Sequence, residues 1–514
     1  MARSLRQLIP AALSAGLLAA LVLGTLGAVT FRAGGFSALG GRDLDALWFT
    51  LWQAAVSALL SCALAVPVAR ALHRRRFAGR GLLIALMGAP FLLPTIAAAM
   101  GLIAVFGRRG ALNGALEALG LPQISIYGAH GVILAHVFFN LPLATRMCRT
   151  VGKLILSERF RLAASLGFAP AEVTRHLERP MLRAVLPGAF LAIFLVCLTS
   201  FAIALTLGGG PKATTVELAI YQAFRFDFDL GRAATLALMQ VGLCLGALAI
   251  SARLTLRAGF GAGLDRPPVA GLTGGALTRL IDSAAIVAAA LFLLVPITLI
   301  LARGVPGLAD LPASIWAASV TSLGLAAAST VLTILLALPL ALAAPRTRWA
   351  EAAAMLPLTA SALVMGTGLY LIARPVVAAS SLALPVTLIA NAALSLPFAV
   401  RLLIPEVRVL QADYDRLAAS LNMSGWARLR LLTLPRLARP LGFSAGLAAA
   451  FSMGDLGVIT LFSDGRTQTL PLALFQLMGA YRMDQAAAAA TLLIALTFGL
   501  FWLLDRIGHH ADPR

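Results

Sequence analysis

The sequence predicts an all-α membrane protein with twelve transmembrane helices, arranged as two homologous six-helix units. Composition and an internal repeat lead to this class. Of the 514 residues, 60% are hydrophobic and 12% are charged, and the mean hydropathy is +0.91. Soluble domains carry about 25% charged residues, so this chain has the composition of a membrane protein.

Twelve apolar runs are long enough to cross a bilayer, which takes about 20 residues of helix. The first run has a short basic head, Arg3 and Arg6, and lacks a small-residue cleavage site, so we expect a retained helix and not a signal peptide. The predicted spans are 8–30, 46–69, 81–105, 128–148, 183–206, 233–252, 279–302, 316–343, 350–373, 381–402, 441–462 and 485–504.

One segment occurs twice: residues 161–166 (RLAASL) reappear 255 residues later as residues 416–421. Because each copy lies among six predicted spans, we expect parallel repeats related by an axis along the membrane normal. The first unit is expected at 1–255 and the second at 276–514, joined by a cytoplasmic linker rich in Gly and Pro at 256–275.

Positive charge in the short loops predicts the orientation. Residues 70–80 carry five arginines and no acid, and the loops at 158–182 and 413–437 are basic as well. If the spans alternate in direction, these loops lie on the same side of the membrane. We therefore expect a protein of the bacterial inner membrane, with these loops and both chain termini on the cytoplasmic side. The net charge of +20 is explained by this placement, and we expect no nucleic-acid partner.

The four cysteines, Cys62, Cys148, Cys197 and Cys244, lie in or at the ends of apolar runs without metal-ligand spacing. We interpret them as small hydrophobic side chains, and we expect neither a metal site nor a cofactor. Gly152-Lys153 lacks the upstream glycine of a phosphate-binding loop, and we find no catalytic arrangement of side chains. The chain is therefore expected to be no enzyme and to take its energy from another polypeptide.

Residues 158–182, the first copy of the repeated loop, predict two short amphipathic helices on the cytoplasmic face, the second beginning at Pro170 and limited by Pro180. For one copy alone, a linker lying on lipid is an equally good interpretation. Two copies in matching positions favour a docking surface for a partner that comes in two copies.

These loops resemble the EAA loop of binding-protein-dependent ABC-importer permeases, whose pattern is Glu-Ala-Ala, three residues, Gly, thirteen residues, Pro. The acid is replaced by arginine in both copies, so the usual Glu contact would need a different ionic partner. The matching positions are Arg161, Leu162, Ala163, Leu166, Gly167 and Pro180, and Arg416, Leu417, Ala418, Leu421, Asn422 and Pro435. The resemblance implies a type I importer fold whose loops dock on two copies of an ABC ATPase subunit.

Among fused double permeases, the chain is most similar to those that import thiamine and thiamine pyrophosphate. The stretches responsible include residues 134–142, 207–215, 217–223 and 454–458. This resemblance implies transport of thiamine or its phosphate esters, delivered by a periplasmic thiamine-binding protein. Fused iron(III) importer permeases share the architecture and are the alternative. A secondary transporter built from two six-helix halves is a weaker alternative.

Asp455 is the only carboxylate well inside a predicted span, and intramembrane acids are functional candidates. It either attracts a cationic substrate in the pathway or hydrogen-bonds near a helix bend. Further pathway candidates that could equally serve helix packing are His136, Asn140, Asn391 and Ser395. Gly208, Gly209 and Gly210 follow a span on the expected external side and suggest a flexible turn or gate.

Overall fold

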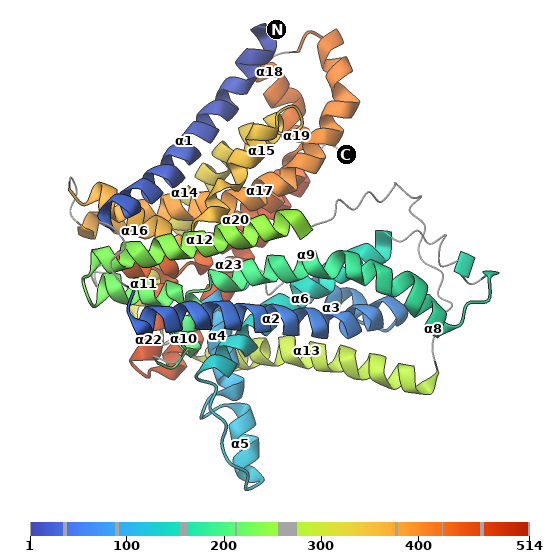
Figure 1. Ribbon diagram of the computed structural model, residues 1–514, viewed down its shortest axis with the longest axis vertical. Coiled ribbons are helices and arrows are strands. Elements are labelled where there is room, and N and C mark those ends of the chain that lie inside the picture. Colours follow the sequence, from blue (N-terminus) through green and yellow to red (C-terminus); the bar gives the residue numbers. More distant parts are fainter. Residues whose placement is uncertain are drawn as a thin grey trace.

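The computed structural model describes residues 2–33, 39–87, 92–154, 162–163, 165–210, 213–254, 275–375, 379–423, 425–462 and 467–511 (Figure 1). Arg161 and all of the predicted linker except Gly275 lie outside these residues. Within them, every regular element is a helix. Eleven helices are long and apolar enough to cross a membrane, or twelve when the bent pair at 348–373 counts as one span. The prediction of an all-α membrane protein is confirmed.

In the expected first unit, the described residues form eleven α-helical segments, which Figure 1 colours from blue to green. They are α1 (Ala2–Arg32), α2 (Gly41–Arg74), α3 (Arg80–Leu86), α4 (Thr95–Phe106), α5 (Ala111–Ala118), α6 (Ala129–Leu154), α8 (Pro170–Val173), α9 (Arg179–Leu198), α10 (Ala202–Leu207), α11 (Val216–Arg225) and α12 (Leu230–Leu254).

The expected second unit, coloured from yellow-green to red, largely repeats this order, except that no helix among its described residues corresponds to α5. Its helices are α13 (Ala276–Gly304), α14 (Ala313–Ala343), α15 (Arg348–Met355), α16 (Ala362–Ala373), α17 (Ala379–Ser420), α18 (Gly425–Arg428), α19 (Leu434–Arg436), α20 (Ala438–Gly454), α21 (Gly457–Phe462), α22 (Leu470–Gly479) and α23 (Met483–His510).

Four predicted spans are broken or bent in the structure. The span expected at 350–373 bends by 89° between α15 and α16, after a 3₁₀ turn at Leu356–Thr359. The span at 183–206 breaks at 199–201, and the one at 441–462 breaks at 455–456. The span at 81–105 gives α3 and α4, with Pro94 as the residue before α4. Apolar composition alone does not reveal such breaks, because backbone groups at membrane depth can be satisfied by neighbouring helices.

The first helix of each unit packs against the other unit. α1 lies along α14 and α16, and α13 lies along α2 and α4 (Figure 1). Glycine makes both contacts possible: a Cβ on Gly368 of α16 would lie 2.5 Å from Thr25 Cβ of α1, and one on Gly101 of α4 would lie 2.9 Å from the Pro296 oxygen of α13. The hydrophobic core correspondingly joins residues of both units, among them Ile96 and Ile459.

Candidate functional site

The second copy of the repeated loop begins at the end of α17. Leu421 N–H donates to Leu417 O at 3.0 Å, and Met423 N–H donates to Ala418 O at 2.8 Å. Asn422, between them, has a left-handed backbone with φ +51°. This is a helix C-cap geometry, which glycine adopts most readily and asparagine adopts next.

The first copy of the repeated loop has the same backbone. Leu166 N–H donates to Leu162 O and Phe168 N–H to Ala163 O, both at 2.9 Å, and Gly167 has φ +70°. Each loop then continues into one short helix and a π-turn, at Thr174–Glu178 and at Leu429–Thr433. The repeat is therefore structural, and the cap explains why Asn422 can stand in the place of Gly167.

The second loop differs from the two short helices expected at 158–182, and one expectation about the first loop is wrong. In the second loop the residues from Arg416 to Ser420 form no separate short helix, because they are the last turns of the 42-residue α17. Pro180 also does not limit a helix, since it lies in the first turn of α9, which continues to Leu198. The π-turn before it, in which Arg179 N–H donates to Thr174 O, accommodates a residue that cannot donate.

The leucine side chains next to both helix caps are exposed on the surface. Leu162 and Leu166 are 59% and 63% exposed, and Leu417 and Leu421 are 53% and 63% exposed. Ala163 and Ala418, in contrast, are buried. The second loop adds exposed Trp426 and Leu431 and the exposed cation Arg416. Apolar side chains gathered on an exposed loop mark an interaction surface.

The breaks in the spans of the two units meet at their interface. Gly457, which follows the α20–α21 break, lies beside Phe201 in the α9–α10 break: a Cβ on it would be 3.9 Å from the Phe201 ring and 3.5 Å from Ala362 Cβ of α16. Asp455 is in this break, and its Oδ1 accepts from Gly457 N–H at 3.1 Å. Its Oδ2 is buried and has no hydrogen-bond partner among the described residues.

Three of the other pathway candidates tie helices together. His136 Nδ1 lies 3.3 Å from Ser57 Oγ of α2, and Asn140 Nδ2 donates to His136 O at 2.8 Å. Asn140 also contacts Cys197 Sγ of α9 at 3.4 Å. In the second unit Asn391 donates to Ser452 Oγ at 3.1 Å, three residues before Asp455.

Ser395 is buried as well. The structure thus brings Asn391 next to the Asp455 break, and it places His136 and Asn140 between α2, α6 and α9.

Comparison with known proteins identifies the family. No family model matches the chain. The thiamine transport system permease protein ThiP of Salmonella typhimurium is 38% identical over 539 residues, which covers 99% of both chains. ThiP of Escherichia coli is 38% identical over 89% of this chain and 88% of its own, and ThiP of Haemophilus influenzae is 31% identical over 92% and 93%. The chain belongs to this family of thiamine transport system permeases. The iron(III) alternative is therefore not favoured.

The glycine run of the permease is a packed turn. Gly209 and Gly210 have positive φ angles of 69° and 129°. A Cβ on Gly209 would lie 2.9 Å from Tyr127 Cβ, and Gly128 N–H donates to Leu207 O at 2.8 Å. Gly208 precedes them in the same turn. The close approach to 127–128 explains why glycine is used here.

Sequence reasoning missed a buried acid of the permease, Glu217 in α11. Burial raises the pKa of Glu217 to about 8, partly offset by hydrogen bonding from Ser361, the residue before α16. Its Oε1 has no partner among the described residues. α11 lies outside the twelve predicted spans, within which functional acids were expected. A threonine at 215 and at 469, one residue before α11 and α22, was the available signal for these two helices.

Two buried glutamines were missed in the same way. Gln53 donates to Cys197 O at 3.0 Å and Gln240 donates to Leu198 O at 2.9 Å, so they satisfy carbonyls at the broken end of α9. The signal was a polar amide within each apolar run.

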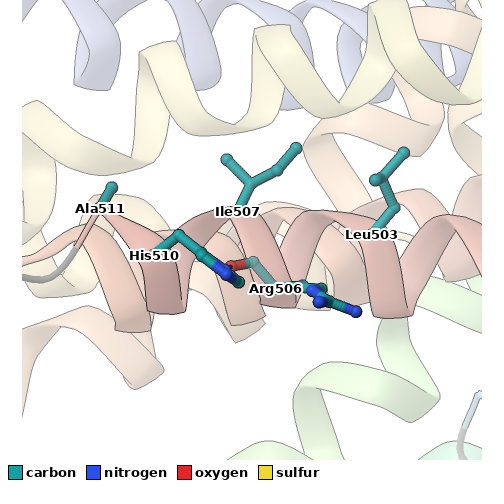
Figure 2. Close-up of a pocket in the computed structure, with 5 residues that line it drawn as sticks. All are labelled: Leu503, Arg506, Ile507, His510 and Ala511. Atoms are coloured by element: carbon teal, nitrogen blue, oxygen red, sulfur yellow. Dashed lines mark hydrogen bonds between the residues drawn. The ribbon is translucent and has the colours of Figure 1, made fainter.

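A surface hollow of about 540 Å³ lies elsewhere, on one face of α23 near the C-terminus (Figure 2). Its five lining residues are Leu503, Arg506, Ile507, His510 and Ala511, and all come from the end of the chain. The hollow holds none of the candidate residues, and we assign it no part in transport.

Proposed function

We propose that the chain is the permease subunit of an ATP-driven ABC importer that moves thiamine or its phosphate esters from the periplasm to the cytoplasm by alternating access. The observation that carries the proposal is the pair of loops with one backbone geometry and one pattern of exposed leucines. The full-length relationship to permeases named for thiamine transport supports the substrate. Residues 1–255 and 276–514 would be the two permease units, consistent with the repeated order of their helices.

The two loops would each dock on one ATPase subunit, which hydrolyses ATP on a separate chain. Leu162 and Leu166 in one loop, and Leu417 and Leu421 in the other, supply matching apolar contacts. Arg416 is exposed, so the facing groove of the ATPase would need an acidic residue. This contact would replace the glutamate contact expected from the EAA loop.

The substrate would pass between the broken spans. Asp455 has a buried oxygen without a partner among the described residues, and its carboxylate would attract the positively charged thiazolium ring. Asn391 would orient the break through Ser452. His136, Asn140 and Ser395 would set helix packing beside the path. A periplasmic thiamine-binding protein would deliver substrate near the Gly208–Gly210 turn, and both chain termini would be cytoplasmic.

The test is ATP-driven uptake of labelled thiamine into proteoliposomes that hold this permease, its ATPase and its binding protein. Uptake that needs all three components is expected. Ferric iron uptake with no thiamine uptake would overturn the substrate and keep the architecture. Thiamine uptake driven by an ion gradient without ATP would favour a secondary transporter.

A further inference from the structure

The cytoplasmic end of α2 carries arginines that are held by an acid of the first loop. Glu178, the last residue of the π-turn, lies 2.6 Å from Arg70 and 3.0 Å from Arg74. Its side chain is 14% exposed, and Thr174 Oγ accepts a hydrogen bond from Arg70 at 3.0 Å. Charges shielded from water in this way are screened less by salt than surface pairs are, so the contact holds its geometry.

The residue that follows α2, Arg75, reaches the other unit. Arg75 Nε lies 2.8 Å from Asp282 Oδ2 of α13, and the two side chains are 16% and 6% exposed. α13 opens the second unit and packs along α2 and α4. Two ion pairs on consecutive arginines therefore connect the first loop to the second unit through the end of α2.

The second loop has an ion pair of its own, which lies within the second unit. Asp415 of α17 contacts Arg346, at 2.8 Å, and Arg428. Arg346, shortly after α14, occupies the position that Arg74 has at the end of α2. The residue after Arg346 is the uncharged Thr347, whereas the residue after Arg74 is Arg75. The Arg346–Asp415 pair is also more exposed, at 44% and 34%, so water weakens it more.

We propose that Arg74–Glu178 and Arg75–Asp282 form an ion-pair relay that transmits movement of the first cytoplasmic loop to α13 of the second unit. Glu178 and Asp282 are then positioning residues for transport. The relay rests on the proposed role of the loops as the ATPase-docking surface. It connects the first loop directly to the opposite unit.

Glu178→Gln, Asp282→Asn and the double variant test the relay in proteoliposomes with the ATPase and the binding protein. Three quantities are measured: ATPase co-purification, ATP hydrolysis, and thiamine transported per ATP. In each single variant we expect the ATPase to stay bound and ATP hydrolysis to continue. The amount of thiamine transported per ATP should fall about three- to tenfold. The double variant falls no further, because both changes cut the same relay.

Asp43→Asn is the matched control. Asp43 pairs with Arg232 of α12 at 2.8 Å and is 6% exposed, so it forms a similarly buried pair at the other end of α2, within one unit. The Asp43→Asn variant should lower the stability of the permease but leave the amount of thiamine transported per ATP unchanged. Asp415→Asn reduces the ratio less than Glu178→Gln does, because its pair is more exposed.

The relay is wrong if both single variants keep the wild-type ratio, or if Asp43→Asn lowers the ratio equally. If Glu178→Gln does not accumulate, Arg74→Gln breaks the same contact while Arg70 still neutralises Glu178. Failure of the unaltered permease to bind the ATPase would instead refute the proposed function.

Discussion

Replacing Gly368 with alanine should loosen the contact between α1 and α16, which joins the two units. A Cβ at this position would lie 2.5 Å from Thr25 Cβ, 2.7 Å from the Thr25 oxygen and 2.8 Å from Thr25 Cα. Carbon atoms pack at about 3.5–4.0 Å, so α1 would have to move by about 1 Å. Two of the three atoms are backbone, and no rotamer change can relieve the clash.

The expected cost is about 3 kcal/mol, the upper end for adding a methyl group to a packed core. Alanine also favours a helix over glycine by about 1 kcal/mol, which would mask part of this cost. Gly324→Ala in α14 supplies the control, because a Cβ there meets nothing within 4 Å. The difference between the two alanine variants isolates the clash.

The assay is the apparent melting temperature of the purified permease in one detergent. The melting temperature is determined from the loss of monodisperse protein on heating. Gly368→Ala should melt several degrees below Gly324→Ala, and Gly101→Ala should fall between them because its closest contact is 2.9 Å. Equal melting temperatures for Gly368→Ala and Gly324→Ala would refute the argument that these glycines admit the opposing helix.

Three further outcomes are expected. Leu166→Asp combined with Leu421→Asp should leave the permease inserted but reduce ATPase co-purification at least tenfold, since charge replaces two exposed apolar contacts; normal co-purification would contradict the docking surface. Asp455→Asn should reduce thiamine uptake more than it reduces protein level, and unchanged uptake would return Asp455 to a structural role. Glu217 has a folded-state pKa of about 8, above its ordinary 4.5, so the folded chain binds this proton more tightly. Wild-type melting temperature should therefore fall as pH rises from about 4.5 to about 8, and Glu217→Gln should flatten this fall; identical pH profiles would contradict it.

Much of the architecture follows from local patterns in the sequence. Long apolar runs predict spans because each must satisfy its own backbone in lipid, and all twelve runs correspond to helical segments of the structure. The RLAASL repeat predicted the equivalence of the two loops, and the caps at Gly167 and Asn422 share one geometry. The role of these loops in ATPase docking stays a prediction.

The sequence alone determined the helical class, the membrane setting and the internal duplication, because hydrophobicity and short repeats are properties of neighbouring residues. Only the tertiary structure decided which segments meet. It placed Thr25 against Gly368, Phe201 beside Gly457, and Arg75 against Asp282. Such pairs are separated by hundreds of residues, and no local pattern specifies them. They arise because each small or charged side chain must find space or an opposite charge once all the helices have packed together.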